Sequence, residues 1–240
     1  RLCLFSVIIL HLPSGKHIFP DKRENKMSEE TSWVPDLAAH ADAEKEANGG
    51  LVEIDIRPLD LRKINFDTVQ KFNYGYYNGK QVANYYDDTG RLVAQKLRAK
   101  DKTFSWIGDP KRATLFGQQL WTPHPKKRVV ITEGEIDALS VSQVQENKWA
   151  VVSVPSGAAG AARAIKKQLE WLSGFKEVVI CFDNDDAGQV AAKEVAALLP
   201  PNKAYIATFP LKDANEMLKA GRIQEIVQCL WDAKKFTPDG

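Results

Sequence analysis

Acidic side chains follow three apolar runs of the sequence, at the point where each run ends. Glu133 and Asp137 lie in the segment TEGEID, Asp183 and Asp185 lie in the segment DND, and Asp213 lies in the segment KDANE. Carboxylates gathered at a dry edge repel one another, which raises their pKa values unless a cation offsets the charge. Because carboxylate oxygens are preferred ligands of hard divalent ions, these acids predict a site for magnesium or manganese.

A parallel sheet is the element that would bring these acids together. Apolar runs at residues 129–132, 151–154, 178–182 and 205–208 are followed by helical patterns over 135–146, 158–172, 186–199, 214–219 and 222–233. This alternation predicts an α/β fold, with a parallel sheet covered by helices on both faces. Ligands of such sheets bind at the carboxyl ends of the strands, which is where the acids are expected.

The segment before this sheet is basic. Residues 51–128 carry fifteen basic and eight acidic side chains, a net charge of +7, whereas residues 129–240 carry twelve and fifteen, a net charge of −3. A hairpin is predicted, with strands over 81–86 and 92–99 and a turn at 87–90. If its second strand continues to residue 102, four cations line one face: Lys96, Arg98, Lys100 and Lys102.

Such a row of cations suits nucleotide phosphates or a DNA backbone, although a solubilising edge strand would also carry lysines. The first interpretation is favoured by the basic and aromatic residues nearby, since aromatic rings stack on bases: Lys111, Arg112, Lys126, Lys127, Arg128, Tyr85, Tyr86, Phe104 and Trp106. Lys212, next to Asp213, is a further candidate phosphate contact.

Several of the acids also have purely structural explanations. Asp186 and Glu135 would be stabilised at helix N-termini, and Asp213 can cap a helix. Residues 183–194 match part of a calcium loop, but a β run precedes them and Ala187 occupies a ligand position. The amides of residues 156–160 could bind an anion. No Walker A motif is present, so the chain is not an NTP-driven motor by itself.

The three cysteines, Cys3, Cys181 and Cys229, are scattered. They exclude a zinc ribbon and a disulfide framework, so no zinc is expected in this chain and a cytoplasmic location is predicted. No apolar stretch is long enough to cross a membrane. Residues 1–50 are expected to be a poorly ordered extension and linker, with Met27 as the natural start.

The three acidic motifs, in this order and at strand ends, resemble the Toprim domain. Over residues 80–240 the chain is similar to the primase half of bifunctional phage replicative primase-helicases. The resemblance implies a basic α+β subdomain over residues 51–127 and a Toprim catalytic domain over 128–240. Relatives with full template-specific priming carry a zinc module, which this chain lacks, and the helicase half is absent as well.

The resemblance implies a DNA-dependent RNA primase. Magnesium would be held by Glu133, Asp137, Asp183, Asp185 and Asp213, and phosphates and template by Lys96, Arg98, Lys100 and Lys102. Glu133 is the candidate general base or metal-positioning acid. Single-stranded DNA, ribonucleoside triphosphates and a replicative helicase are the implied partners. The alternatives are a Toprim nuclease or topoisomerase-like strand cleaver, and a non-catalytic module that binds single-stranded DNA or loads a helicase.

Overall fold

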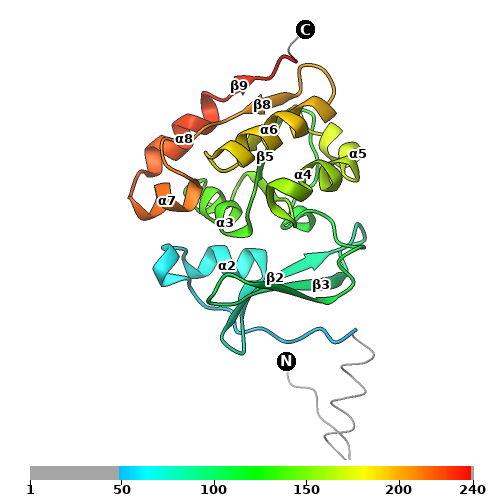
Figure 1. Cartoon of the computed structure of the whole chain (residues 1–240), viewed down its shortest axis with the longest axis vertical. Coiled ribbons are helices and arrows are strands. Elements are labelled where there is room, and N and C mark those ends of the chain that lie inside the picture. The colour runs from blue at the N-terminus through cyan, green and yellow to red at the C-terminus, as the bar shows by residue number, and fades with distance from the viewer. Residues whose placement is uncertain (1–48, 239–240) are drawn as a thin grey trace, which may run out of the picture. The chain divides into compact units, whose positions relative to one another are not determined.

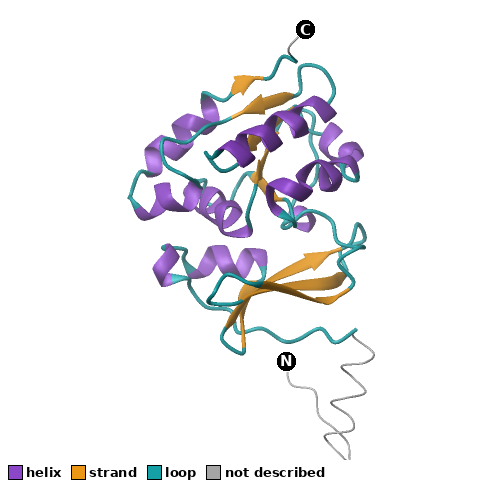
Figure 2. Cartoon of the chain, viewed as in Figure 1, coloured by secondary structure: helices purple, strands orange, loops and turns teal. Residues whose placement is uncertain are grey.

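The computed structural model describes residues 49–238, which form two β-sheets and the helices around them (Figures 1 and 2). The expectations for Cys3, for Met27 and for nearly all of the extension over residues 1–50 lie outside this range. Among the described residues, no helix is both long enough and apolar enough to cross a bilayer. The predicted domain boundaries at residues 50 and 127 stay a prediction.

The first sheet is antiparallel and contains the predicted hairpin. A short 3-10 helix (η1, Asp60–Arg62) and α2 (Phe66–Phe72) precede it. Its strands are consecutive in the sheet: β1 (Tyr74–Tyr77), β2 (Lys80–Tyr86), β3 (Leu92–Arg98) and β4 (Phe104–Gly108). The predicted turn at residues 87–90 is confirmed: the Asp87 carboxylate accepts hydrogen bonds from the Thr89 and Arg91 amides at 3.1 and 3.0 Å.

The prediction that the second hairpin strand continues to residue 102 is wrong. β3 ends at Arg98, and the chain turns back at once into β4. The Lys102 amide donates to the Ala99 carbonyl at 3.0 Å, and Lys102 adopts a left-handed φ of 68°. Asp101 fixes the turn by accepting hydrogen bonds from the amide and hydroxyl of Thr103 at 3.0 and 2.7 Å. The four cations therefore do not share one strand face.

The second sheet confirms the predicted α/β alternation. Its strands are β5 (Arg128–Thr132), β6 (Ala150–Ser153), β7 (Glu177–Cys181), β8 (Ala204–Ile206) and β9 (Lys234–Lys235), in the order β6-β5-β7-β8-β9. The first four are parallel. The helices are α3 (Glu135–Val144), α4 (Gly157–Lys166), α5 (Leu169–Ser173), α6 (Asp186–Leu198), α7 (Ala214–Lys219) and α8 (Ile223–Trp231); a 3-10 helix, η2 (Gln118–Leu120), precedes β5.

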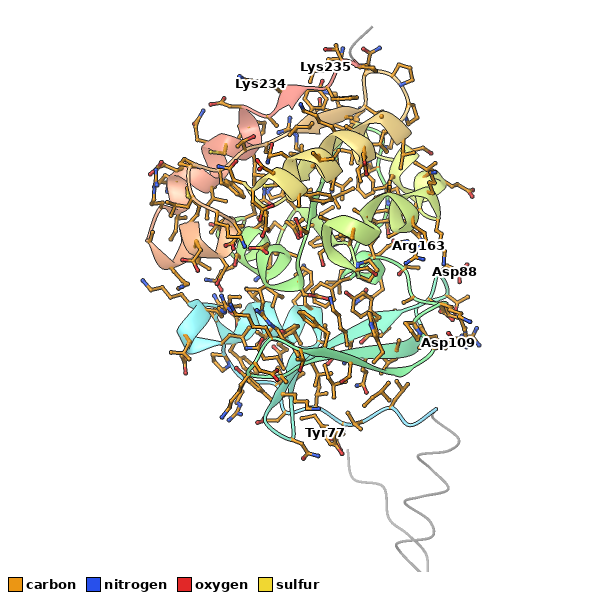
Figure 3. All side chains as sticks on the ribbon, in the orientation of Figure 1. Tyr77, Asp88, Asp109, Arg163, Lys234 and Lys235 are labelled. Carbon is orange, nitrogen blue, oxygen red and sulfur yellow. The ribbon has the colours of Figure 1, made fainter. Side chains whose placement is uncertain are left out.

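Two details differ from the prediction. The helical pattern over 158–172 is divided into α4 and α5, and an unpredicted antiparallel strand, β9, closes the sheet next to β8. Lys234 and Lys235 on β9 are both exposed, and Figure 3 shows their side chains at this outer edge. Charged side chains on an edge strand discourage pairing with another sheet.

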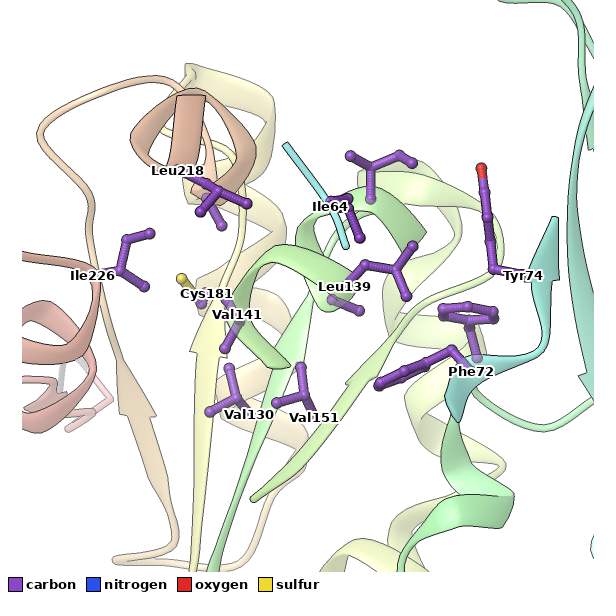
Figure 4. Close-up of a cluster of buried hydrophobic side chains, with 14 of the residues drawn as sticks. Ile64, Phe72, Tyr74, Val130, Leu139, Val141, Val151, Cys181, Leu218 and Ile226 are labelled. Carbon is purple, nitrogen blue, oxygen red and sulfur yellow. The ribbon is translucent and has the colours of Figure 1, made fainter. Parts of the chain in front are cut away.

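Alternate residues of the parallel strands point to opposite faces, and each face has its own core. Val129 and Ile131 of β5 pack in one cluster with α4 and α6, whereas Val130 packs in the other with α3, α7 and α8. Figure 4 shows part of this second cluster, including Val130, Val141 and Leu218. Because both faces are covered, the interiors of the strands are unbroken apolar runs, such as residues 129–131 and 178–181, as predicted.

The second cluster also contains residues of the N-terminal segment. Phe72 and Tyr74 belong to it, together with the fully buried Tyr85 and Phe116. Phe116 stacks on Phe72 at a centroid distance of 5.5 Å, and its backbone pairs with Ser153 at the end of β6. The two sheets therefore share one hydrophobic cluster, of which Figure 4 labels Phe72 and Tyr74 together with Val130 and Val151 of the parallel sheet.

Candidate active site

A groove of about 840 Å³ lies where the carboxyl ends of the parallel strands face the antiparallel sheet. Four of the five predicted acids line it: Glu133, Asp137, Asp183 and Asp213. Lys96, Arg98, Lys102, Phe104 and Trp106 line it from the antiparallel sheet, and Lys212 lies beside Asp183. Asp185 and Lys100 are not among its lining residues. The groove thus places a cluster of carboxylates opposite a wall of cations and aromatic rings.

Glu133 lies directly after β5 and reaches the start of α4. One carboxylate oxygen accepts a hydrogen bond from the Ala158 amide at 3.1 Å. The other oxygen, Oε2, is buried and has no hydrogen-bond partner among residues 49–238. The amides of residues 156–160 were a candidate anion site, and Glu133 is the anion that lies there. A buried carboxylate oxygen without a partner is costly, so Oε2 is a natural place for a cation.

Asp137 lies in the first turn of α3, one helical turn beyond Glu133. Its Oδ1 accepts the Asn215 amide at 3.1 Å, which ties α3 to the start of α7. Burial raises the pKa of the Asp137 carboxyl well above its ordinary value, and the charges of Asp213, Asp183 and Glu133 raise it further. Gly134 is the N-cap of α3, and a Cβ at this position would lie 3.0 Å from Asp137 Oδ2.

Asp183 follows β7 and is the centre of the negative charge. Burial and the charges of Glu133 and Asp213 raise its pKa to about 6, although Lys212 acts in the opposite direction. The Lys212 ammonium lies 3.5 Å from Asp183 and 3.8 Å from Asp185. Its own pKa is raised, chiefly by Asp183. The Lys212 ammonium supplies positive charge at the edge of the acidic cluster.

Asp185 and Asp213 both cap helices. Asp185 accepts the Gly188 amide at 2.9 Å at the start of α6, and Asp213 accepts the Glu216 amide at 2.7 Å at the start of α7. Asp213 still lines the groove, so capping leaves its second oxygen for other ligands. Because residues 186–194 are helical, they do not form the calcium loop that was considered.

Gly188 is required by the close approach of α6 to Asp183. A Cβ at Gly188 would lie 3.1 Å from the Asp183 amide nitrogen and closer still to its carbonyl oxygen. We expect Gly188→Ala to push the residues 183–185 away from the groove and to destabilise the protein by about 1–3 kcal/mol. Thermal denaturation checks this. Val190→Ala, at an exposed position of the same helix, should leave the melting temperature nearly unchanged; equal effects would contradict the role of Gly188.

Lys96 is the best anchored cation of the groove. Its ammonium lies 2.8 Å from Glu135 Oε1 and 2.8 Å from the Pro155 carbonyl. The same Glu135 oxygen accepts a hydrogen bond from the buried Tyr85 hydroxyl at 2.6 Å. Glu135 was expected to serve as a residue of a helix N-terminus. It does lie in the first turn of α3, but its contacts reach the antiparallel sheet.

Fewer aromatic side chains line the groove than predicted: Phe104 and Trp106 do, but Tyr85 and Tyr86 do not. The Lys96 ammonium lies 4.6 Å from the Phe104 ring centroid and the Arg98 guanidinium 5.8 Å from it. Tyr85 is fully buried and has no face for a base. Lys111 and Arg112 line a different hollow, where Arg112 pairs with Asp87 at 2.7 Å.

Sequence reasoning missed the residues that hold the acids in place. Asn215 is buried. Its side chain forms hydrogen bonds with Ser140 and Arg62, and its backbone amide donates a hydrogen bond to Asp137. Arg62 itself comes from η1 and lines the groove. Asn215 lies within the KDANE segment, but its side-chain partners Ser140 and Arg62 lie about 75 and 150 residues away in the sequence. No local pattern indicates such contacts.

The acids of the groove suit a divalent cation. Across residues 49–238, no three His, Cys, Asp or Glu side chains already converge on one ion position. The chemistry of the groove nevertheless fits a cation. Glu133 Oε2 has no partner in the described part of the chain, and the pKa values of Asp137 and Asp183 are raised by burial and, in addition, by neighbouring carboxylates. A bound cation would relieve each of these penalties.

Two family models match the chain. Residues 130–218 match the model described as Toprim-like. Residues 55–108 match the model described as the N-terminal α+β fold of bacteriophage T7 DNA helicase/primase. The chain is also similar to the DNA helicase/primase of Enterobacteria phage T3, with 40% identity over 188 residues that cover 76% of this chain and 32% of the relative. The chain therefore spans about a third of that relative's length.

Two solved structures are similar as well. The primase fragment of bacteriophage T7 primase-helicase matches with a TM-score of 0.69 and 39% identity, covering 74% of this chain and 75% of the fragment. The structure of bacteriophage T7 lagging-strand DNA polymerase interacting with primase domains bound to an RNA/DNA hybrid and dTTP matches with a TM-score of 0.71 and 39% identity. That match covers 76% of this chain and 94% of the other.

Proposed function

Because this chain belongs to the Toprim primase family, together with the primase half of phage primase-helicases, we propose that it is a DNA primase that makes short oligoribonucleotides on single-stranded DNA. The reaction is nucleotidyl transfer: a 3′-hydroxyl attacks the α-phosphate of a ribonucleoside triphosphate, a new P–O bond forms, and pyrophosphate leaves. The observation that carries the proposal is the groove, in which Glu133, Asp137, Asp183 and Asp213 face Lys96 and Arg98.

Magnesium or manganese fits the acidic side of the groove. Glu133, Asp137, Asp183 and Asp213 would hold it. Asp185, whose carboxylate contacts the same Lys212 ammonium as Asp183, is a further candidate ligand. When bound, two such ions orient the attacking hydroxyl and neutralise the charge that develops on the leaving pyrophosphate. We propose that Glu133 either accepts the proton of the 3′-hydroxyl as a general base or positions the metal.

The chain's own cations would hold the substrate. Lys96, fixed by Glu135, presents its ammonium at the edge of the groove, and Arg98 and Lys102 lie further along the same wall. Lys212 lies close enough to Asp183 to contact a triphosphate bound there. Phe104 is 54% exposed and offers a ring face for a template base or an incoming base.

The proposal includes the partners that the family suggests. The matched phage relative is a fused helicase and primase, so we propose that a replicative helicase works with this chain, either as a further part of a longer protein or as a separate chain. We also propose that it acts in the cytoplasm of the infected cell. We divide it into a basic segment over residues 51–127 and a catalytic segment over 128–240.

We expect the full chain to convert ribonucleoside triphosphates into oligoribonucleotides when single-stranded DNA and magnesium are both present. Asp183→Ala should abolish this product, with a loss of about a thousandfold or more, because it removes a carboxylate at the centre of the acidic cluster. Gel electrophoresis of labelled products measures it. Asp186→Ala, at the exposed first residue of α6, is the matched control and should retain synthesis.

Other outcomes would identify the alternatives. Magnesium-dependent loss of the DNA itself, sensitive to Asp183→Ala, would indicate a Toprim nuclease. DNA binding that is equal in the wild type and in Asp183→Ala, without synthesis or cleavage, would indicate a non-catalytic binding module. Either result would contradict the primase proposal.

A further inference from the structure

A second hollow lies at the opposite end of the parallel sheet from the groove. It has a volume of about 440 Å³ and is lined by the first residues of three neighbouring strands, Arg128 of β5, Ala150 of β6 and Glu177 of β7. The groove, in contrast, is formed at the carboxyl ends of these strands. A five-residue strand is roughly 17 Å long, so the two hollows are separate sites. We refer to the second one as the basal cleft.

The basal cleft is strongly basic. Five basic and two acidic side chains line it, a net charge of +3: Lys126, Lys127, Arg128, Lys148 and Lys176 against Glu146 and Glu177. Both acids are already paired, Glu177 with Arg128 and Lys176, and Glu146 with Lys148. Lys126 and Lys127 are exposed and have no ion-pair partner within the part of the chain that the structure describes. The unpaired positive charge of the cleft is therefore carried by Lys126 and Lys127, immediately before β5.

The strand order arranges these cations in a row. Lys127 precedes β5, Lys148 precedes β6 and Lys176 precedes β7, and the sheet order is β6-β5-β7. The Lys176 amide donates to the Lys127 carbonyl at 2.7 Å, so the chain segments that carry these two residues are in direct contact. Neighbouring strands are about 4.8 Å apart. The residues that carry these cations therefore follow one another along the end of the sheet, and a row of cations suits an extended polyanion better than a single small anion.

Two tryptophans complete the cleft. Trp149 is 47% exposed and Trp231 is 65% exposed, which is unusual for the largest apolar side chain. The Arg128 guanidinium lies 4.9 Å from the Trp231 ring centroid and fixes this indole at the rim. Buried Val130 and Leu230 are among the apolar residues that line the cleft. Exposed rings beside a track of cations are the features by which proteins bind unpaired bases and their phosphates.

We propose that the basal cleft is a second binding site for single-stranded DNA. Bases stack on Trp149 and Trp231, and the phosphates lie along Lys126, Lys127 and Lys176. The inference relies on the proposed function only in taking single-stranded DNA as the ligand, because binding here needs neither metal nor catalysis. Its role would be to hold template that extends beyond the groove.

The test uses the full chain without magnesium and a fluorescein-labelled oligodeoxythymidylate of about 16 nucleotides. Trp149→Ala and Trp231→Ala should each weaken binding about tenfold, as expected for loss of a stacked base. The double change Lys126→Ala and Lys127→Ala should lower the slope of log affinity against log salt by about 1.4, since each lost phosphate contact contributes about 0.7. Fluorescence anisotropy measures both effects.

Matched controls lie elsewhere on the chain. Lys234→Ala with Lys235→Ala removes the same charge at β9, and Phe66→Ala removes another exposed aromatic ring. Both should bind like the wild type. If the basal-cleft variants also bind like the wild type, or if all variants weaken binding equally, the inference is overturned. The second result would mean that the charge of the whole molecule, not the cleft, attracts DNA.

A site-specific measurement guards against misfolded variants. An oligomer carrying 5-iodouracil, irradiated on the wild-type protein, should crosslink to peptides that contain Trp149 or Trp231. Crosslinks confined to the groove would overturn the inference, as expected if the cleft binds an acidic protein segment instead. Lys234→Ala with Lys235→Ala, at β9, should crosslink like the wild type. Primer synthesis without basal crosslinks counts against this inference alone, whereas basal crosslinks without synthesis count against the primase proposal alone.

Discussion

Replacing Glu135 with Ala is expected to lower the free energy of unfolding by about 3–5 kcal/mol, more than any other single change discussed for this protein. The Glu135 and Lys96 side chains are each only 11% exposed, and their charged atoms lie 2.8 Å apart. Removing the carboxylate leaves the Lys96 ammonium without its counter-charge and the buried Tyr85 hydroxyl without an acceptor. Chemical denaturation of the metal-free protein measures the loss.

The control for this prediction is an exposed ion pair on another helix. Glu225 binds Arg222 at 2.7 Å, but it is 49% exposed, so Glu225→Ala should destabilise the protein far less than Glu135→Ala. A second comparison is the double variant Glu135→Leu with Lys96→Met. Because it removes both charges, it should be more stable than Glu135→Ala. If Glu135→Ala lowered the free energy of unfolding no more than Glu225→Ala, the buried pair between Glu135 and Lys96 would not stabilise the contact between the two sheets.

Replacing Asp183 with Asn should make the metal-free protein more stable at neutral pH while removing its activity. The folded protein raises the pKa of Asp183 from 3.8 to about 6. Folding therefore favours the protonated form, and this contribution to stability is complete below about pH 4 and is lost as the pH rises through 6. Above that pH the ionised carboxylate destabilises the folded state by up to about 3 kcal/mol. The uncharged amide avoids this penalty.

Thermal denaturation at pH 5 and pH 8, with and without magnesium, tests this argument. In EDTA, Asp183→Asn should melt above the wild type at pH 8, and the difference should shrink at pH 5. Magnesium should raise the melting temperature of the wild type more at pH 8, because protons compete for the carboxylate at pH 5. Asp186→Asn should respond to magnesium like the wild type. A pH-independent difference between Asp183→Asn and wild type would contradict the raised pKa.

The sequence was sufficient to predict the parallel sheet and the groove edge, because those features depend on local pattern. Unbroken apolar runs such as residues 178–182 mark strands buried on both faces. The acids that follow them must then meet at one edge. The groove does bring Glu133, Asp137, Asp183 and Asp213 together. Asp185 is not among the residues that line it, and its role as a metal ligand stays a prediction.

The remaining features depend on contacts between distant residues. The alternation of cations up to Lys102 looked like a strand, but an aspartate at position 101 and a left-handed residue at 102 form a tight turn instead. Tyr85 looked like a stacking residue because no local signal separates an exposed tyrosine from one buried by Phe116 and Trp106. The hydrogen bond of Tyr85 to Glu135 spans 50 residues. The spacing of apolar residues along the sequence does not indicate a contact between residues this far apart.

The aromatic packing between Phe72 and Phe116 also limits how this protein can be rebuilt. A chimera that took its basic half from one relative and its acidic half from another would have to reproduce this packing, since Phe116 both stacks on Phe72 and pairs with the end of β6. The two halves are thus inherited as a matched pair. Changes that tune template handling are expected to accumulate at the groove rim, where exposed side chains can vary without disturbing that shared interior.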